Sequence, residues 1–399
     1  MKVAYEEFHM LSDEKADLSG YGFSRGVTDE CLDAPLCCLF LMKNDQNLYL
    51  LITLDTVAIS EEFTKEIKMA LEKEGIYKEN VNIMALHTHS GPGITCFPDD
   101  CKFDGSTIRN KQLALSLQKK IIKSVKKMKE TMQEMQIWCG EININGCYGN
   151  RNDPKKQVCK KMYLTKFVTT EEENKTKIVV ANMSCHSTIL KADTMQFSSD
   201  LAGAVRRNLS KIYRCPCMMT IGAAADVSSR FYVKEHDYQA VLKTGEEIAS
   251  QVRNIQFQKM VIHDISIETL PFDEIYDPRV DEELRLLIKR LKGTNLEFMI
   301  PTLEKRRRHG KFHIKTYATI MKTSIADIIF FPGELVTALG DKIRNSVEKK
   351  VIFCCYANDY WQYFVAKEEY GKYFETANSI CPKGMADQFV EMMIQKLKG

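Results

Sequence analysis

The fold is decided by a short apolar run that ends in two histidines, Val81-Asn82-Ile83-Met84-Ala85-Leu86-His87-Thr88-His89-Ser90-Gly91-Pro92-Gly93. Residues 81–86 are compact and mostly apolar, which predicts a buried strand. His87 and His89 are two residues apart, so they point to the same side of an extended chain. Gly91 and Gly93 let the backbone come close to a ligand. Polar side chains directly after a strand mark the edge of the sheet where α/β folds usually build their sites.

Similar apolar runs recur along the chain and alternate with amphipathic segments. The runs that predict strands are residues 36–42, 48–54, 81–86, 178–183, 218–221, 324–331 and 351–356. The segments that predict helices are residues 60–74, 108–130, 200–212, 240–253, 281–291, 335–347 and 386–398. This alternation is typical of the α/β class. Residues 261–267 partly alternate apolar and polar side chains, so we expect mixed β-sheets flanked by helices.

The domain organisation follows from the length of 399 residues, which suits one large catalytic domain over residues 1–399. The most irregular part is a charged insertion at about 272–310, which includes Arg306-Arg307-Arg308-His309. It is either an insertion that covers a substrate or a solvated helical hairpin.

Composition excludes several classes of protein. Hydrophobic residues make up 44% and charged residues 27% of the chain, which is typical of a globular protein. A net charge of +3 is too weak a bias to indicate a nucleic-acid partner. The sequence lacks an apolar run of the ~18 residues that a transmembrane segment needs, and its first residues lack a signal-peptide core. The 14 cysteines show no zinc-module or disulfide spacing, which favours a reducing, cytoplasmic compartment.

Two more strand-like runs are followed by residues that bind metals. His186 comes after the run 178–183, and Glu334 lies in Phe330-Phe331-Pro332-Gly333-Glu334-Leu335. Taken alone, His186 fits a hydrogen-bonded core histidine, and Glu334 fits a carboxylate that favours the first turn of a helix. Together with His87 they form a His-His-Glu set. A catalytic zinc site typically has three protein ligands and one open coordination position, which this set would provide.

Other polar residues after strands have more than one interpretation. Ser228, in Ala225-Asp226-Val227-Ser228-Ser229-Arg230, is a candidate nucleophile, a hydrogen-bond donor or a plain turn residue. A serine nucleophile needs an adjacent base. Tyr360 can ligate or hydrogen-bond near a cation, or simply pack. Ser199 or Asp200 is expected to cap the helix over 200–212.

Taken together, these segments resemble the catalytic domain of the neutral/alkaline ceramidases, over most of the chain and in the same order. The matching segments are His87-Thr88-His89-Ser90-Gly91-Pro92-Gly93, Gly149-Asn150-Arg151-Asn152, His186, Ala225-Asp226-Val227-Ser228, Pro332-Gly333-Glu334, Asn358-Asp359-Tyr360 and Glu368-Glu369-Tyr370. The resemblance implies that zinc is bound by His87, His186, Glu334 and Tyr360. It also implies that the reaction centre is lined by His89, Arg151 and Ser228.

The chain departs from that family in three respects. The family's Gly-Asp-Val-Ser-Pro-Asn stands here as Ala225-Asp226-Val227-Ser228-Ser229-Arg230, so the wall beside the serine differs. We also expect the protein to lack the immunoglobulin-like C-terminal domain and the secretion signal of the family. The sequence also shows no amphipathic anchor with Trp or Phe on one side. We therefore expect a smaller or more soluble N-acyl substrate than long-chain ceramide.

The chemistry that follows is metal-assisted hydrolysis. Zinc lowers the pKa of its bound water to about 7 and polarises an amide carbonyl. Arg151, with Tyr360 or His89, would stabilise the oxyanion. His89 would pass a proton to the leaving amine, and Ser228 would position the substrate or act as nucleophile. The sequence thus predicts a zinc-dependent hydrolase of a small-molecule N-acyl or lipid amide. The alternatives are a metallohydrolase acting on esters, lactams or other small amides, and a non-catalytic zinc-binding protein.

Overall fold

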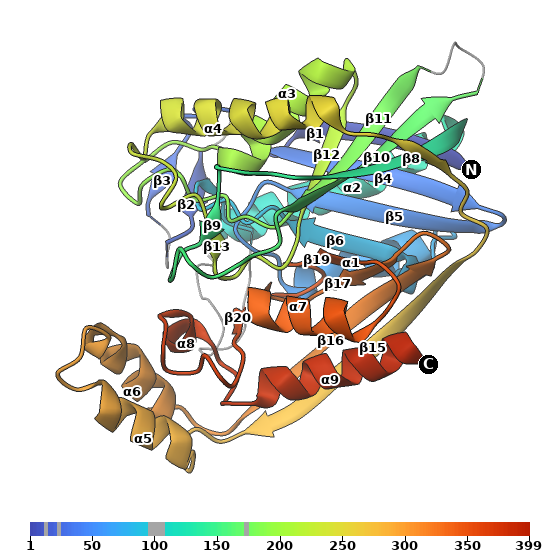
Figure 1. Cartoon of the computed structure of the whole chain (residues 1–399). Coiled ribbons are helices and arrows are strands. Elements are labelled where there is room, and N and C mark those ends of the chain that lie inside the picture. The colour runs from blue at the N-terminus through green and yellow to red at the C-terminus, as the bar shows by residue number, and fades with distance from the viewer. Residues whose placement is uncertain (12–14, 22–24, 95–107, 171–174) are drawn as a thin grey trace.

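The computed structural model describes residues 1–11, 15–21, 25–94, 108–170 and 175–399. Two β-sheets lie against each other, and helices cover their outer faces, which gives four layers (Figure 1). Both sheets combine parallel and antiparallel pairs. The predicted α/β class with mixed sheets flanked by helices is therefore confirmed.

The larger sheet contains nine strands within the described residues. Their order is β12 (Cys217–Ile221), β11 (Thr176–Met183), β10 (Lys161–Thr169), β8 (Gln133–Asn143), β1 (Lys2–His9), β4 (Leu36–Asn44), β5 (Asn47–Leu54) and β6 (Val81–Ala85), with β14 (Gln258–Met260) beside β8. The pairs β5–β6 and β11–β12 are parallel. Their carboxyl ends are followed by the segments that carry His87, His186 and Ser228.

The smaller sheet has the order β15 (Ile265–Tyr276), β16 (Phe312–Thr323), β17 (Asp327–Phe330) and β19 (Val351–Cys354). Its parallel pair is β17–β19, so Glu334 and Tyr360 also follow carboxyl ends. Short pairs join the loops around these ends: β13 (Val227–Ser228) with β9 (Gly149–Asn150), β18 (Glu334–Leu335) with β20 (Tyr363–Phe364), and β2 (Ala16–Ser19) with β3 (Val27–Thr28) and β7 (Gly91–Pro92).

The layers follow from the two-residue repeat of the strands. On β4, Phe40 belongs to the apolar cluster that also contains Met321 and Phe330 of the smaller sheet. The adjacent residues Leu39 and Leu41 instead belong to the cluster that contains side chains of the covering helices. Each sheet thus has buried side chains on both faces. One face packs against the other sheet, and the opposite face packs against helices.

Each predicted helix is present and one has the predicted bounds, but the helices over residues 300–308 and 375–378 were not predicted. The helices are α1 (Glu61–Glu72), α2 (Ile108–Glu130), α3 (Asp200–Tyr213), α4 (Tyr238–Gln251), α5 (Glu282–Leu291), α6 (Ile300–Arg308), α7 (Thr337–Ser346), α8 (Glu375–Asn378) and α9 (Met385–Lys398). The predicted helix over 335–347 begins only at Thr337, because Glu334 and Leu335 form β18 instead. No helix in the described part of the chain is long and apolar enough to cross a bilayer.

The charged segment 272–310 contains the end of β15 and a helical hairpin. The hairpin consists of α5, a 3-10 turn η3 (Glu297–Met299) and α6, and it connects the antiparallel strands β15 and β16. Figure 1 shows it projecting from the body of the molecule beside α8. It has its own small apolar core, which also contains Tyr370 and Ala377.

Candidate functional site

The site is built where three loops meet beyond the strand ends. His87 Nε2 lies 3.4 Å from Glu334 Oε2, and His186 Nε2 lies 3.0 Å from the same oxygen. The loop of His87 runs beside that of His186, because Thr88 and Ser187 form a parallel bridge. Glu334 is fixed by its pairing with Tyr363 in β18–β20. All three side chains are about 1% exposed.

The backbone at this junction is unusual. His87 has a φ of 56°, in the left-handed region that non-glycine residues seldom adopt. Tyr356 and Asn358, in the loop after β19, also have positive φ values. The ring of Tyr356 stacks on His87 with centroids 4.1 Å apart. Strained backbone of this kind persists where the surrounding structure holds it, and it gathers at functional sites.

Hydrogen bonds to the backbone set the tautomers of two histidines. His87 Nδ1 lies 2.6 Å from the carbonyl oxygen of Val57, and His186 Nδ1 lies 2.6 Å from that of Ala224. A carbonyl only accepts, so each Nδ1 carries the proton and donates. Burial lowers the pKa of His186 to about 4, so this ring is neutral near pH 7. Each Nε2 then presents a lone pair toward Glu334.

Glu334 completes a set of facing acceptors. Burial raises its pKa, but the neighbouring His87 and His186 outweigh burial and hold the pKa well below its usual value. His186 Nε2 and the carboxylate are therefore both hydrogen-bond acceptors, and neither can donate a proton to the other. A cation bound between them would interact favourably with both. Histidines that bind metals almost always donate their other ring N–H to a carbonyl or carboxylate, as His87 and His186 do here. The residues present thus fit a divalent metal such as zinc.

His89 lies close to this set but has different hydrogen bonds. The imidazole nitrogens of His87, His89 and His186 approach within 4.8 Å of one another. His89 Nδ1 accepts from the backbone N–H of Tyr21 at 3.3 Å, so its neutral ring carries the proton on Nε2. That Nε2 donates to His87 Nε2 at 3.2 Å. Burial and the neighbouring His87 hold the pKa of His89 well below its usual value. His89 therefore presents a donor toward the centre, where His87 and His186 present acceptors.

Tyr360 contacts the carboxylate from the other side. Its hydroxyl donates to Glu334 Oε1 at 2.5 Å. Burial and the charge of Glu334 raise the pKa of Tyr360, so the hydroxyl keeps its proton. The structure brings Tyr360 to the predicted ligand set, where it orients Glu334 through a hydrogen bond.

Arg151 reaches the site through the pairing of β9 with β13, which sets Ser228 opposite Gly149. Its Nε donates to Glu375 Oε1 at 2.9 Å, and its Nη2 donates to the hydroxyl of Tyr363 at 3.1 Å. Glu375 and its role were missed in the sequence, because it belongs to no motif and lies 224 residues from Arg151. Its position within an aromatic-rich stretch, Tyr373-Phe374-Glu375, was the available signal.

Ser228 lies on the same wall. Its Oγ accepts from the backbone N–H of Arg230 at 3.2 Å. Within the described part of the chain, this oxygen has no hydrogen bond to a histidine or a carboxylate that would act as its base. The geometry therefore favours a positioning role over a nucleophilic one.

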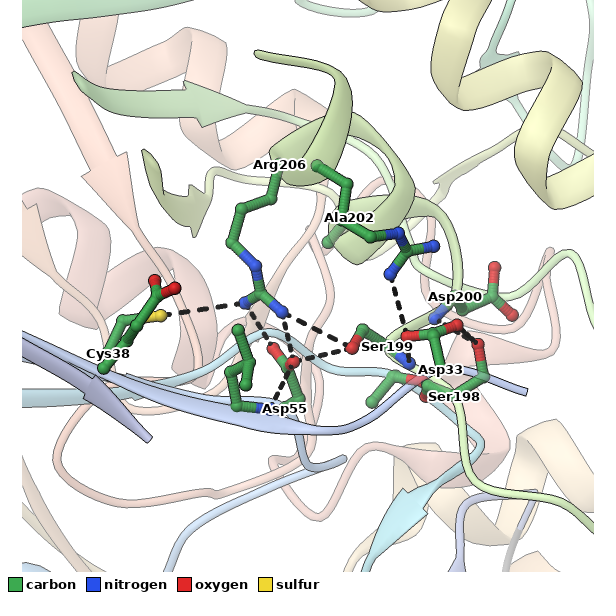
Figure 2. Close-up of polar contacts among 12 residues, drawn as sticks. Asp33, Cys38, Asp55, Ser198, Ser199, Asp200, Ala202 and Arg206 are labelled. Carbon is green, nitrogen blue, oxygen red and sulfur yellow. Dashed lines mark hydrogen bonds and ion pairs between the residues drawn. The ribbon is translucent and has the colours of Figure 1, made fainter. Parts of the chain in front are cut away.

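A buried polar network fixes the start of α3 and residues 198–199 before it, which lie next to the loop of His87 (Figure 2). Arg206 of α3 donates to both carboxylate oxygens of Asp55, at 2.9 and 2.6 Å, and Ser199 Oγ donates to Asp55 at 2.6 Å. Ser198 is tied to the loop, since its carbonyl accepts from Thr88 Oγ1 at 2.7 Å. Ser199 occupies the N-cap position as predicted, but its hydroxyl donates to Asp55 instead of accepting from the helix.

Asp200 has a wider role than a cap. Its carboxylate accepts the N–H groups of Ile189 and Leu190, at 3.1 and 3.0 Å, and that of Leu201 at 2.6 Å. Ile189 and Leu190 belong to the loop after His186. Asp200 therefore fixes this loop to the start of α3.

Most side chains of the candidate site line one pocket of about 630 Å³. Its wall contains His87, His89, Arg151, Ser228, Glu334 and Tyr360, all of them residues singled out in the sequence. His186 lies behind this wall, in contact with Glu334. Further lining residues are Tyr21, Ile189, Leu190, Lys191, Arg230, His236, Tyr363, Phe374 and Asn378. The volume is within the range of small-molecule sites.

Comparisons with known proteins establish the fold. Neither the protein-family models nor the curated proteins gave a match. Among solved structures, the neutral ceramidase from Pseudomonas aeruginosa matches with a TM-score of 0.78 and 15% identity, over 100% of this chain and 74% of that one. A structure described as a ceramidase complexed with C2 matches with a TM-score of 0.77 and 13% identity, over 98% of this chain and 74% of that one. The ceramidase-like fold implied by the sequence is therefore confirmed.

Proposed function

We propose that this protein is a zinc-dependent hydrolase of N-acyl amides. The observation that carries the proposal is the convergence of the Nε2 atoms of His87 and His186 on the Glu334 carboxylate, beside a pocket that His87 and Glu334 line. The proteins with the matching fold are described as ceramidases, which supports an amide substrate. A zinc ion held by His87, His186 and Glu334 would activate water and polarise the substrate carbonyl.

The remaining side chains have roles that fit amide cleavage. Arg151 presents a guanidinium fixed by Glu375 and Tyr363, suited to the charge that develops on the carbonyl oxygen. His89 holds its Nε2 proton toward the centre and is suited to donate to the leaving amine. Ser228, on the same wall as Arg151, would position the substrate, and Tyr360 orients Glu334.

The test combines metal content with hydrolysis. The purified protein, reconstituted with zinc, is expected to carry close to one ion per chain and to release amine from N-acyl compounds. His186→Ala should lose the ion and the activity, because an incomplete set of ligands remains. The matched control is His236→Ala, since His236 also lines the pocket but contacts the carbonyl of Ile189. Equal metal content in wild type and His186→Ala, or no metal-dependent hydrolysis of any amide, would contradict the proposal.

A further inference from the structure

The α5–α6 hairpin concentrates positive charge. The hairpin, residues 282–308, contains eight lysines and arginines against four glutamates, although the whole chain has a net charge of only +3. Figure 1 shows that the hairpin projects from the body rather than packing within it. The charge is therefore displayed on a protruding element.

Most of this charge is not neutralised locally. Arg285 and Arg307 pair with glutamates of their own helices, and Arg306 donates to backbone carbonyls. Arg308 also donates to a backbone carbonyl, and the exposed side chains without an acidic partner among the residues that the structure describes include four more, Lys289, Arg290, Lys292 and Lys305. Three of these four lie at the end of α5 near the tip of the hairpin.

Exposed apolar side chains accompany the cations. The inner face of α5 is buried, but Leu286 on the outer face is 43% exposed. Leu286 precedes Lys289 and Arg290 by three and four residues, so the three share one helix face. Phe298, in the turn between the two helices, is 64% exposed. The tip of the hairpin thus combines a free phenyl ring with a cationic, partly apolar helix face.

The hairpin is joined to the wall of the pocket. Arg306 Nη2 donates to the carbonyl oxygens of Thr376 and Ala377 in α8, at 3.0 and 2.7 Å. The flanking residues Phe374 and Asn378 line the pocket. Arg230, which also lines the pocket, is exposed and is followed by Phe231, which is 52% exposed. The hairpin is therefore joined to the pocket wall through α8, and an exposed cation and aromatic ring at residues 230 and 231 also lie at the pocket.

We propose that the α5–α6 hairpin docks on a lipid bilayer that contains anionic lipid, and so brings the pocket to an amide held in that bilayer. Cations attract anionic headgroups, and exposed Leu and Phe side chains enter the boundary between headgroups and acyl chains. A nucleic acid would use the cations but would leave the apolar Leu286 without a role. The inference rests on the proposed function for the location of the active site, and it departs from the expectation from sequence that the chain has no amphipathic anchor and acts on a smaller or more soluble substrate than long-chain ceramide.

Helix α2 provides a matched control. Its exposed residues Lys119 and Lys123 are four residues apart, follow the exposed Leu115 and have no acidic partner in the part of the chain that is described. Unlike the hairpin, α2 packs along the body against α1 and the larger sheet. Lys119 and Lys123 are exposed cations like those of the hairpin, but they do not lie on a protruding element.

The experiment is cosedimentation of the full chain with phosphatidylcholine vesicles that contain either no phosphatidylserine or 30% phosphatidylserine, at about 0.1 M salt. Binding is expected with the anionic vesicles and should weaken as salt rises. Lys289→Gln/Arg290→Gln should weaken it about 25-fold, and Phe298→Ser about tenfold. Lys119→Gln/Lys123→Gln should change it less than twofold.

Three outcomes would overturn the docking proposal. They are equal binding to both kinds of vesicle, equal loss of binding in the α2 variant, and tighter binding to a 20-nucleotide RNA than to the vesicles. Hydrolysis of a short, soluble N-acyl compound without vesicles is measured in parallel. That activity should be the same in the hairpin variants, so its absence from the wild type would count against the proposed function and not against docking.

Discussion

Replacing Arg206 by methionine is predicted to destabilise the fold by about 3 kcal/mol. The side chains of Arg206 and Asp55 are 4% and 0% exposed, so the pair is buried (Figure 2). Breaking a buried pair on one side costs about 3–5 kcal/mol, because an uncompensated charge remains. Asp55 would still accept from the N–H of Leu36 and from Ser199 Oγ, which places the expected cost at the lower end.

The assay is equilibrium unfolding in urea at pH 7, followed by tryptophan fluorescence. The matched control is Arg207→Met, one residue along α3. Arg207 pairs with Asp33 but is 33% exposed, so its loss should cost about 1 kcal/mol or less. A cost below 1 kcal/mol for Arg206→Met, or one equal to that of Arg207→Met, would refute the reasoning that burial makes the Arg206–Asp55 pair structurally essential.

Three further predictions concern charge and catalysis. Burial lowers the pKa of Lys68 from 10.5 to about 8, so between these values Lys68 binds a proton in the unfolded chain but not in the folded one, and its contribution to stability should rise with pH across that window. In urea unfolding, the stability of the wild type relative to that of Lys68→Met should rise by about 3 kcal/mol over the window, and an equal pH dependence in the two proteins would contradict the assignment. Glu375→Gln should lower kcat roughly ten- to hundredfold with little change in KM, because Arg151 loses its anchor, and a change in KM alone would argue for ground-state binding. Ser228→Ala should lower kcat/KM by about ten- to hundredfold, whereas a loss of ~10⁶ would identify Ser228 as the nucleophile.

The fold could be predicted from sequence where burial makes the pattern simple. Strands β4, β5, β6 and β11 are apolar runs with polar ends, and α2 shows a helical stripe, so these elements have nearly the predicted bounds. Strands such as β8 and β10 were missed, because their polar and apolar residues are mixed and many side chains are only partly buried.

Only those site residues that come soon after a predicted strand could be identified from local patterns in the sequence. His87, His186 and Glu334 each follow a strand, and the structure brings them together. Glu375 and the backbone carbonyls that fix the histidine tautomers come from distant segments. Such partners depend on how the loops pack against one another, which no local pattern records.

The central claim is that His87, His186 and Glu334 hold a metal ion. The most direct measurement is an anomalous difference map, recorded above and below the zinc absorption edge from crystals of the zinc-loaded protein. We expect one peak about 2.0–2.2 Å from His87 Nε2, His186 Nε2 and a carboxylate oxygen of Glu334. A map without a peak at this position, or with a peak held by His89 in place of Glu334, would contradict it.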